Sequence, residues 1–522
     1  MKKSGKFAGK ILAAVVSMAI ILTIFSACGS VSESGISSAS VVAASDSAAS
    51  AGNLNAITLK FFIPGDDRPA KAEVLNALYQ QTKERLNAKF EINFIPFGDY
   101  QNKLTMMAAS GDDYDVAFTA DWFGFSNMVN KGAFLGITDL AKQYAPTLYK
   151  FYEDNGILGP CSIDGQLMAL PWTEVKTSKP VFMWRKDIAD KLGVQPSDLT
   201  TIEGIDQFVT AIASAKPGMT VFDMNVASGR QYGDIIALLQ PKYEFMDMGF
   251  HSFVVDLNDT SNRVVPVEQT DMFREAVKLA KKWYDSGVIS KNSLAEKEVK
   301  LFESGKIFSG KNISEKLYEK TNFTDKTAVC GAVEVYPDNK FNRDTPLNNA
   351  MAVNKNAANP ERALMFFELI STDSSVYDTL IYGIKDKTYT IDDKGIVGFT
   401  KEEDPAKPLW QNWNFWGFLR HDFVKPTVTR DAEAIQKEYE YSTRPNILVS
   451  PISGFVANPD PIKTELARRD QILEEQGKLL LAGIVKGDID KSINDYIAKQ
   501  KAAGLDKIIA ELQKQVDSKI NR

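Results

Sequence analysis

The sequence predicts an α/β fold with a parallel sheet, and three observations lead to this prediction. Short apolar runs alternate with amphipathic segments of about 10–15 residues, which is typical of βαβ units. The alternation starts at Ile57 and begins again at Val181, which indicates two such regions. With 522 residues, 44% of them hydrophobic, the chain can form one large bilobal unit or several small domains.

The first region contains three predicted strands and two predicted helices. Each strand is a short apolar run, and each helix repeats apolar residues at intervals of three and four. The strands are expected at 57–63, 90–95 and 115–119, and the helices at 70–86 and 100–110. Because ligands bind beyond the carboxyl ends of strands in open α/β sheets, the loops at 64–68 and 120–122 are expected beside a ligand.

The second region repeats the pattern and ends in a helical tail. A strand is expected at 181–184, followed by helices at 187–192, 202–215 and 273–287 and a further helix opened by Pro360. Glycine after a helix and proline in its first turn are common at helix ends, which supports a stop at Gly287 and the start at Pro360. The last stretch, 461–520, is charged and helical, with a break at Gly504.

The N-terminus has the composition of an export signal. Four lysines precede an apolar run at 11–25, which is too short to span a bilayer comfortably. The run ends in Phe25-Ser26-Ala27-Cys28-Gly29, which resembles the bacterial lipobox, although that pattern prefers Leu where Phe25 stands. The resemblance implies a lipoprotein signal peptide at 1–27 and a Cys28 carrying diacylglycerol, with fatty acids such as palmitate; the alternative is a plain secretory peptide cut near Ala27. Residues 28–53, rich in Ser and Ala, are expected to form a flexible tether.

The charge and the few histidines and cysteines argue against several functions. Lys+Arg 61 against Asp+Glu 67 gives a net charge of −6, so nucleic acid is not expected as a partner. Two histidines and three cysteines argue against a zinc site, a histidine-based triad or a disulfide scaffold. The segment 305–312 nearly matches a phosphate-binding loop but has Asn312 where Ser or Thr is required. No metal or cofactor is expected. Cys161 and Cys330 are predicted to be two buried free thiols, while a disulfide between them stays open.

The order of several landmarks resembles that of the extracellular solute-binding lipoproteins of Gram-positive ABC importers, in the carbohydrate-binding class that includes maltose-binding protein. The landmarks are Asp115–Trp122, Gly165–Pro171, Trp184–Asp187, Lys282–Gly287 and Asn359–Ala363. The tail from Gly454 to Glu511 resembles the C-terminal module of a large subgroup of these lipoproteins, a module without an assigned function.

The resemblance implies a two-lobed, periplasmic-binding-protein-like fold of type II, in which each lobe is a sheet flanked by helices and a hinge joins them. Lobe 1 is expected to comprise 54–171 plus 348–372, and lobe 2 to comprise 172–347 plus 373–522 with the helical module. The resemblance further implies a non-enzymatic, lipid-anchored monomer on the extracellular face of the cell membrane. It would capture an oligosaccharide between its lobes and deliver it to the transmembrane subunits of an ABC permease.

Sugar binding needs aromatic faces against the apolar surface of a pyranose, together with carboxylates and amides that bind its hydroxyls. Candidates of these types follow the predicted strands, follow the expected crossover, or lie in the tryptophan cluster at 410–416. The three tryptophans of this cluster are spaced by three, which suits one side of a helix, and the alternative is that they pack in a core. The candidate substrate-binding residues are Asp66, Asp121, Trp122, Trp172, Glu174, Trp410, Trp413 and Trp416.

Other functions stay open from the sequence alone. A glycoside hydrolase or a polysaccharide lyase would need paired carboxylates, and 67 acidic residues supply these without deciding the question. A lipoprotein that presents its ligand to a membrane sensor would have the same fold. A peptide or another small solute is an alternative ligand, and no motif encodes the identity, length or linkage of an oligosaccharide.

Overall fold

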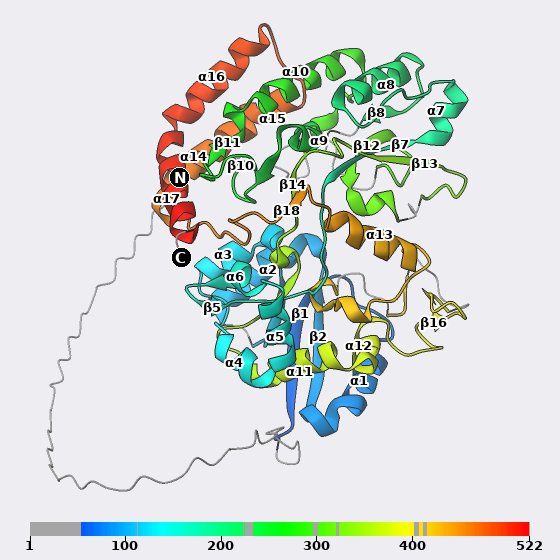
Figure 1. Ribbon diagram of the computed structural model, residues 1–522, viewed down its shortest axis with the longest axis vertical. Coiled ribbons are helices and arrows are strands. Elements are labelled where there is room, and N and C mark those ends of the chain that lie inside the picture. The colour runs from blue at the N-terminus through cyan, green and yellow to red at the C-terminus, as the bar shows by residue number, and fades with distance from the viewer. Residues whose placement is uncertain are drawn as a thin grey trace, which may run out of the picture. The chain divides into compact units, whose positions relative to one another are not determined.

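The computed structural model describes residues 54–111, 113–222, 224, 233–295, 301–319, 323–400, 407–410 and 415–520. The predicted signal peptide, Cys28, the tether and Trp413 lie outside these residues. No helix in the described part of the chain is long and apolar enough to cross a membrane. The described residues form two α/β lobes with separate hydrophobic cores, and a helical C-terminal module with a smaller core (Figure 1).

Lobe 1 is built on a five-stranded sheet with the strand order β2-β1-β3-β15-β6. β1 pairs in parallel with β2 and β3, whereas β15 is antiparallel to both β3 and β6. The sheet is therefore mixed rather than wholly parallel as predicted, because β15 enters from the other lobe and needs no crossover helix. The elements of lobe 1 are β1 (Ile57–Pro64), α1 (Lys71–Leu86), β2 (Ala88–Ile95), α2 (Phe97–Ser110), β3 (Val116–Thr119), α3 (Phe125–Asn130), α4 (Thr138–Tyr144), α5 (Pro146–Asp154), α6 (Leu158–Cys161), β4 (Ser162–Ile163), β5 (Gln166–Leu167), β6 (Leu170–Pro171), β15 (Ala350–Val353), α11 (Pro360–Thr372), α12 (Ser374–Ile381), β16 (Thr390–Ile391) and β17 (Val397–Gly398).

The core of lobe 1 corrects its predicted boundary. α1 forms where helical spacing predicts it, because Val74, Leu78 and Leu86 all face this core. The same core contains Leu380 of α12 and, further along the chain, Phe418. Lobe 1 therefore comprises 54–171 and 347–423, and the chain does not leave it after about residue 372, as was expected. Apolar residues past that point bury more surface here than they would as a loop in solvent.

Lobe 2 holds a four-stranded sheet with the order β13-β7-β12-β8 and a three-stranded sheet with the order β11-β10-β9. β7 is antiparallel to β12 and β13, and β8 is parallel to β12. Trp283 is fully buried in the core, and Gly287 ends α10 with a φ of +77°, where the sequence predicts the stop. The elements of lobe 2 are β7 (Pro180–Arg185), α7 (Lys186–Leu192), α8 (Ile202–Ser214), β8 (Thr220–Phe222), α9 (Asp234–Tyr243), β9 (Phe245–Asp247), β10 (Phe253–Asp256), β11 (Val265–Pro266), α10 (Asp271–Ser286), β12 (Ile307–Ile313) and β13 (Cys330–Glu334).

The C-terminal module, residues 451–520, packs on β9 and β10 of lobe 2. Its α17 contributes Ile508 and Leu512 to a core that it shares with Met246 and Phe253. The expected break at Gly504 separates its last two helices. The elements are α14 (Lys463–Ile472), a π-helical turn (Leu473–Gly477), α15 (Lys478–Leu481), α16 (Ile489–Ala502) and α17 (Leu505–Ile520).

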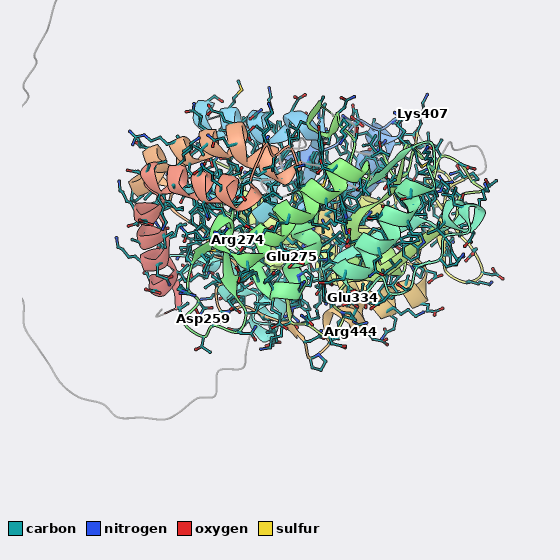
Figure 2. The ribbon with its side chains drawn as sticks, turned by 90° about the horizontal axis from the view of Figure 1, so that it is seen from above. Asp259, Arg274, Glu275, Glu334, Lys407 and Arg444 are labelled. Atoms are coloured by element: carbon teal, nitrogen blue, oxygen red, sulfur yellow. The ribbon has the colours of Figure 1, made fainter. Side chains whose placement is uncertain are left out.

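Three segments of the described chain connect the lobes, at 172–179, 336–346 and 424–431. The second segment carries β14 (Phe341–Asn342), which pairs in parallel with β18 (Ile447–Leu448). Between the third segment and β18 lies α13 (Ala432–Ser442), which packs against lobe 2. Its neighbour Arg444 pairs with Glu334 of β13 at 2.9 Å, and the two side chains lie together in Figure 2. These segments form the hinge that the family resemblance implies.

Cys161 and Cys330, the two cysteines of the described chain, form no disulfide with each other. Cys161 in lobe 1 is buried, whereas Cys330 in lobe 2 is partly exposed. The prediction that the two cysteines stay unbridged is therefore confirmed, and only the full burial of Cys330 was wrong.

Candidate functional site

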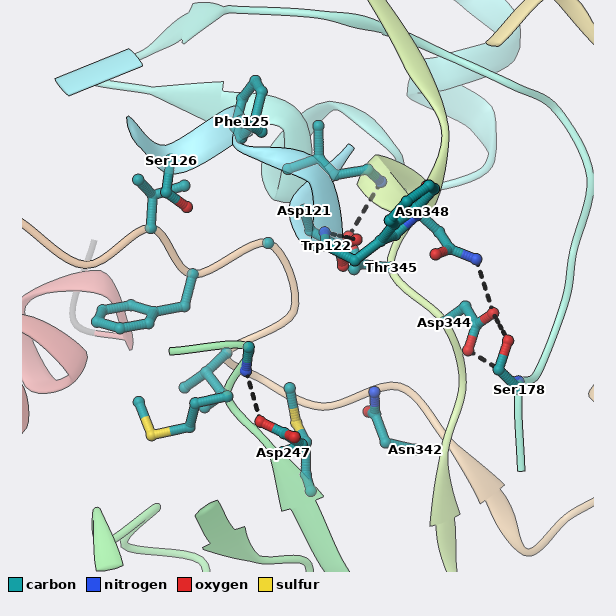
Figure 3. Close-up of a pocket in the computed structure, with 18 of the residues that line it drawn as sticks. Asp121, Trp122, Phe125, Ser126, Ser178, Asp247, Asn342, Asp344, Thr345 and Asn348 are labelled. Atoms are coloured by element: carbon teal, nitrogen blue, oxygen red, sulfur yellow. Dashed lines mark hydrogen bonds between the residues drawn. The ribbon is translucent and has the colours of Figure 1, made fainter. Parts of the chain in front are cut away.

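Two residues that the sequence predicts at a ligand site lie directly beyond β3. A short 3₁₀ helix, η2 (Asp121–Phe123), follows this strand and ends at Gly124, whose φ is +88°. The turn presents Asp121 and Trp122 at the carboxyl edge of the sheet, where open α/β sheets bind ligands. Both residues line a cavity of about 280 Å³ (Figure 3).

Trp122 offers the cavity a fixed aromatic surface. Its indole N–H donates to the backbone carbonyl of Asn348 over 2.6 Å, which holds the ring beside the point where the chain re-enters lobe 1. The ring packs on Phe97 with centroids 6.1 Å apart, and Trp416 meets it edge-on at 6.4 Å. The side chain nevertheless stays 47% exposed, which is unusual for tryptophan. A held but open indole face is suited to stacking against a ligand.

The cavity is lined from both lobes, from a crossing segment and from the C-terminal module. A second cavity of about 390 Å³ adjoins it and shares Trp122, Ser178, Gln240, Asp247 and Gly249. Each volume is near the lower end of the range of small-molecule sites, about 300–1,000 Å³. The polar and aromatic residues that line the first cavity are Asp121, Trp122, Phe125, Ser126, Ser178, Gln240, Asp247, Phe341, Asn342, Asp344, Thr345, Asn348 and Phe455.

Three aspartates face this cavity, and all have raised pKa values. Loss of bulk water raises the pKa of Asp121 to about 7; the N–H of Trp122 opposes this, and the charges of Asp344 and Asp247 add to it. The side chain of Asp247 keeps surface open to the cleft, but the surrounding protein displaces its bulk water and raises its pKa to about 6. Burial also raises the pKa of Asp344. Near neutral pH Asp121 therefore occurs in both its protonated and its ionised form, and can both donate and accept hydrogen bonds.

Asp344 orders the hinge beside the cavity. Its carboxylate accepts from the Ser178 hydroxyl at 2.7 Å and from the side-chain amide of Asn348 at 2.9 Å (Figure 3). The backbone N–H of Ser178 also donates to it, over 2.9 Å. Two crossing segments are thus held together next to Trp122.

The lining of the first cavity favours a neutral, hydroxyl-rich ligand. Among the described residues that line it are three carboxyls, two asparagines and several hydroxyls, but no Lys or Arg. Carboxylate and amide oxygens accept hydrogen bonds from hydroxyl groups, and the indole of Trp122 covers an apolar face. This combination of groups suits a sugar.

Trp410 does not line the cavity. Its side chain is fully buried in the core of lobe 1, and its indole N–H donates to the carbonyl of Leu380 over 2.9 Å. The ring packs against Phe94 and Phe415. Trp410 thus packs in the core and does not face the ligand site, which was the alternative left open for this cluster.

Trp172 and Glu174 lie in the hinge rather than in the cavity. The Glu174 side chain is 3% exposed and pairs with Lys176 at 3.1 Å and with Arg430 at 3.4 Å. Burial alone would raise the pKa of Glu174, but these two cations hold it below its usual value. Lys176 also lies over the ring of the buried Trp172, 5.4 Å from its centroid. Both residues lie after the crossover, as the sequence predicts. Glu174, however, pairs with Lys176 and Arg430 of the hinge and does not face the cavity.

The other predicted residues divide between the surface and the edge of the site. Asp66 is on an exposed turn and does not line the first cavity. Trp416 is half-buried behind Trp122 and supports it, in a 3₁₀ helix (Trp416–Phe418). Trp413 lies outside the described residues, so the helix expected at 410–416 stays a prediction over 411–414.

Sequence reasoning missed the residues that reach the cavity from elsewhere. Asp247 ends β9, Asn342 and Asp344 lie in a crossing segment, and Phe455 opens the C-terminal module. The rule that located Asp121 would have found Asp247, had the short strand before it been recognised. The segment at 342–345 comes just before the expected return to lobe 1. Its polar residues could have identified it as part of the ligand site.

The sequence matches the family described as bacterial extracellular solute-binding protein over residues 77–384. The chain belongs to this family. Residues 451–519 match a second family, described as a domain of unknown function, DUF3502. A carbohydrate ABC transporter substrate-binding protein of Streptococcus pneumoniae serotype 4 is 25% identical over 510 residues, covering 92% of this solute-binding protein and 96% of the relative.

Crystal structures of solute-binding proteins share the fold. The N-glycan transport solute binding protein (NgtS) of Streptococcus pneumoniae matches with a TM-score of 0.75 and 21% identity, over 89% of this solute-binding protein and 99% of NgtS. NgtS in complex with Man1GlcNAc matches with a TM-score of 0.69 at 20% identity, over 89% of this chain and 100% of that one. The alginate-binding protein AlgQ2 matches with a TM-score of 0.60 and 17% identity, over 90% of this chain and 99% of AlgQ2. The two-lobed fold is therefore confirmed.

Membership of the family settles two questions that the sequence left open. The family is non-enzymatic, which removes the hydrolase and lyase alternatives. It is also extracellular, in agreement with the export signal expected at the N-terminus. No cluster of His, Cys, Asp or Glu that could hold a metal ion occurs among the residues the structure describes.

Proposed function

We propose that this solute-binding protein is the lipid-anchored, monomeric receptor of an ABC importer, and that it captures an oligosaccharide between its lobes for delivery to the transmembrane permease. The observation that carries the proposal is the half-exposed Trp122 face beside Asp121, Asp247 and Asn342 in one cavity. The relative from Streptococcus pneumoniae, a carbohydrate transporter component, supports the transport role.

The cavity's position supports capture by closure of the lobes. Trp122 belongs to lobe 1, Asp247 to lobe 2, and Asp344 to a segment that crosses between them. A ligand that touches all three favours the arrangement in which they are close, so binding shifts the lobes toward a closed state. The permease would then recognise the closed pair of lobes.

Trp122→Ala should weaken oligosaccharide binding by about tenfold to a hundredfold. Removing a stacking face loses about 1–3 kcal/mol of apolar burial in the complex. Man1GlcNAc and Man5GlcNAc, which the complexes of NgtS contain, are the first probes of a wider glycan panel. Binding is measured by isothermal titration calorimetry, and the ligand is recovered afterwards to confirm that it is unchanged.

Trp122→Phe is the matched control for this experiment. It keeps an aromatic face but removes the N–H donor to Asn348, so it should lose less affinity than the alanine variant. Wild-type protein that binds no member of the panel would contradict the oligosaccharide proposal. Equal affinity of wild type and Trp122→Ala would place the sugar elsewhere.

The proposed anchor rests on the lipobox-like sequence around Cys28. Cys28→Ser removes the thiol that would carry diacylglycerol, so the protein should no longer reach the membrane fraction in its processed, lipid-bearing form. Metabolic labelling with a fatty acid and cell fractionation measure this. Undiminished labelling and membrane retention of Cys28→Ser would show that the anchor lies elsewhere.

A further inference from the structure

The C-terminal module belongs to a domain family of unknown function, yet part of it lines the cavity. The loop that leads into the module, residues 450–458, is here named the clasp loop. Ile452, Gly454, Phe455 and Val456 of this loop all line the first cavity. Phe455 is the only aromatic among them and is partly exposed.

The module holds the clasp loop from one side. Lys519, near the end of α17, donates to the carbonyl of Gly454 over 3.1 Å. Gln515 binds both backbone groups of Asn458, accepting from its N–H at 2.8 Å and donating to its carbonyl at 3.0 Å. α17 thus holds the clasp loop at its middle, through Gly454, and at its end, through Asn458.

Lobe 1 holds the clasp loop from the other side. The side-chain amide of Asn130, which ends α3, donates to the carbonyl of Ala457 over 2.9 Å. Gly454 approaches α6 so closely that a Cβ atom there would lie 2.0 Å from the carbonyl oxygen of Pro160. The module therefore contacts lobe 1 as well as lobe 2, through backbone groups of a single loop.

The module also supports the acidic wall of the cavity. Met246 of β9 and Met248 just after it are buried in the core shared with the module, and both line the cavity on either side of Asp247. The module thus holds the residues that flank Asp247, while its own loop also lines the cavity.

We propose that this module of unknown function is a ligand-binding clasp, in which Phe455 contacts the bound sugar and Gly454 positions the clasp loop against lobe 1. The proposal rests on the oligosaccharide function proposed above. If the module is a clasp, the affinity for the solute depends on the contact between the module and lobe 1. A module that only stabilised lobe 2 would not need this contact.

Gly454→Ala tests the positioning role, and Gly487→Ala is its matched control. Both glycines have positive φ, +68° and +78°, so alanine strains the backbone similarly at each. A Cβ at Gly487 meets nothing within 4 Å, whereas at Gly454 it collides with Pro160. Gly454→Ala should weaken glycan binding at least tenfold, and Gly487→Ala should stay within about twofold of wild type.

Phe455→Ala tests the contact itself and guards against a Gly454 variant that folds poorly. It should lose about tenfold in affinity with at most a small drop in melting temperature, because the ring packs against the module's core but is only partly buried. Glycan affinity equal to wild type in both Phe455→Ala and a folded Gly454→Ala would overturn the proposal.

Amide hydrogen exchange without ligand separates this inference from the proposed function. In Gly454→Ala, but not in Gly487→Ala, exchange should speed up in the clasp loop and in lobe 1 around 126–131. Equal protection in the two variants would overturn the clasp. Wild-type protein that binds no glycan would contradict the proposed function alone, and the exchange comparison would still decide whether the module is coupled to lobe 1.

Discussion

Trp410→Ala should lower the free energy of unfolding by about 3–5 kcal/mol, because it leaves a large cavity in the core of lobe 1. The indole is fully buried, and its N–H satisfies the carbonyl of Leu380. Gly383 passes so close that a Cβ there would lie 2.8 Å from the Trp410 ring, which leaves the surroundings little freedom to collapse into the space. Denaturant unfolding followed by circular dichroism measures the change.

Trp122→Ala is the contrasting variant, because the same residue type is 47% exposed there. It should unfold within about 1 kcal/mol of wild type while losing glycan affinity. Trp410→Ala should show the opposite, with normal affinity in the protein that stays folded. Near-wild-type stability of Trp410→Ala together with lost binding would return Trp410 to the ligand site.

Glu268→Ala should cost about 3–5 kcal/mol of stability by leaving a buried arginine without its partner. Arg469 of α14 donates three hydrogen bonds to Glu268, one from Nε at 3.2 Å and two from a terminal guanidinium nitrogen at 3.0 and 2.8 Å, and the side chains are 1% and 3% exposed. Arg469 also donates to the carbonyl of His251 and lies over the ring of Phe253. Thermal and denaturant unfolding of the full chain measure the loss.

The double variant Glu268→Leu with Arg469→Met should recover most of this loss. Apolar side chains of similar volume avoid the cost of removing two charges from water, so replacing a buried pair is often nearly neutral. A double variant as unstable as Glu268→Ala would mean that hydrogen bonds to the backbone, rather than the pair itself, hold the module on lobe 2. Loss of only a few tenths of a kcal/mol in Glu268→Ala would contradict the burial of the pair.

Local pattern was enough to predict most elements near the N-terminus. β1, α1 and β2 form within a few residues of their predicted bounds, because period-two and helical spacing reflect which face each segment buries. The boundary between lobes was not predictable in this way. α12 has the apolar spacing of any buried helix, and nothing in its sequence states which of two cores it will join.

The candidate site was predicted where one strand end sufficed and missed where several segments meet. Asp121 and Trp122 follow a recognisable strand, so a rule about sheet edges located them. Trp410 and Trp122 both have polar neighbours in the sequence, and only tertiary packing buries the first and leaves the second open. Asp247 lies between two residues of a core against which Phe455 also packs, a relation between distant segments that no short window of sequence contains.

The position of β15 in the middle of the lobe 1 sheet has a consequence for how the chain is made. β15 ends at Val353 and separates β3 from β6, so the sheet stays incomplete until after the last strand of the lobe 2 sheet, which ends at Glu334, has been synthesised. Until then β3 has an unpaired edge, and exposed edges invite pairing with other chains. Contacts between residues so far apart in sequence also slow folding. Lobe 1 therefore cannot complete its sheet before the strands of the four-stranded lobe 2 sheet have been made, and a nascent chain interrupted before Val353 would be open to aggregation through that edge.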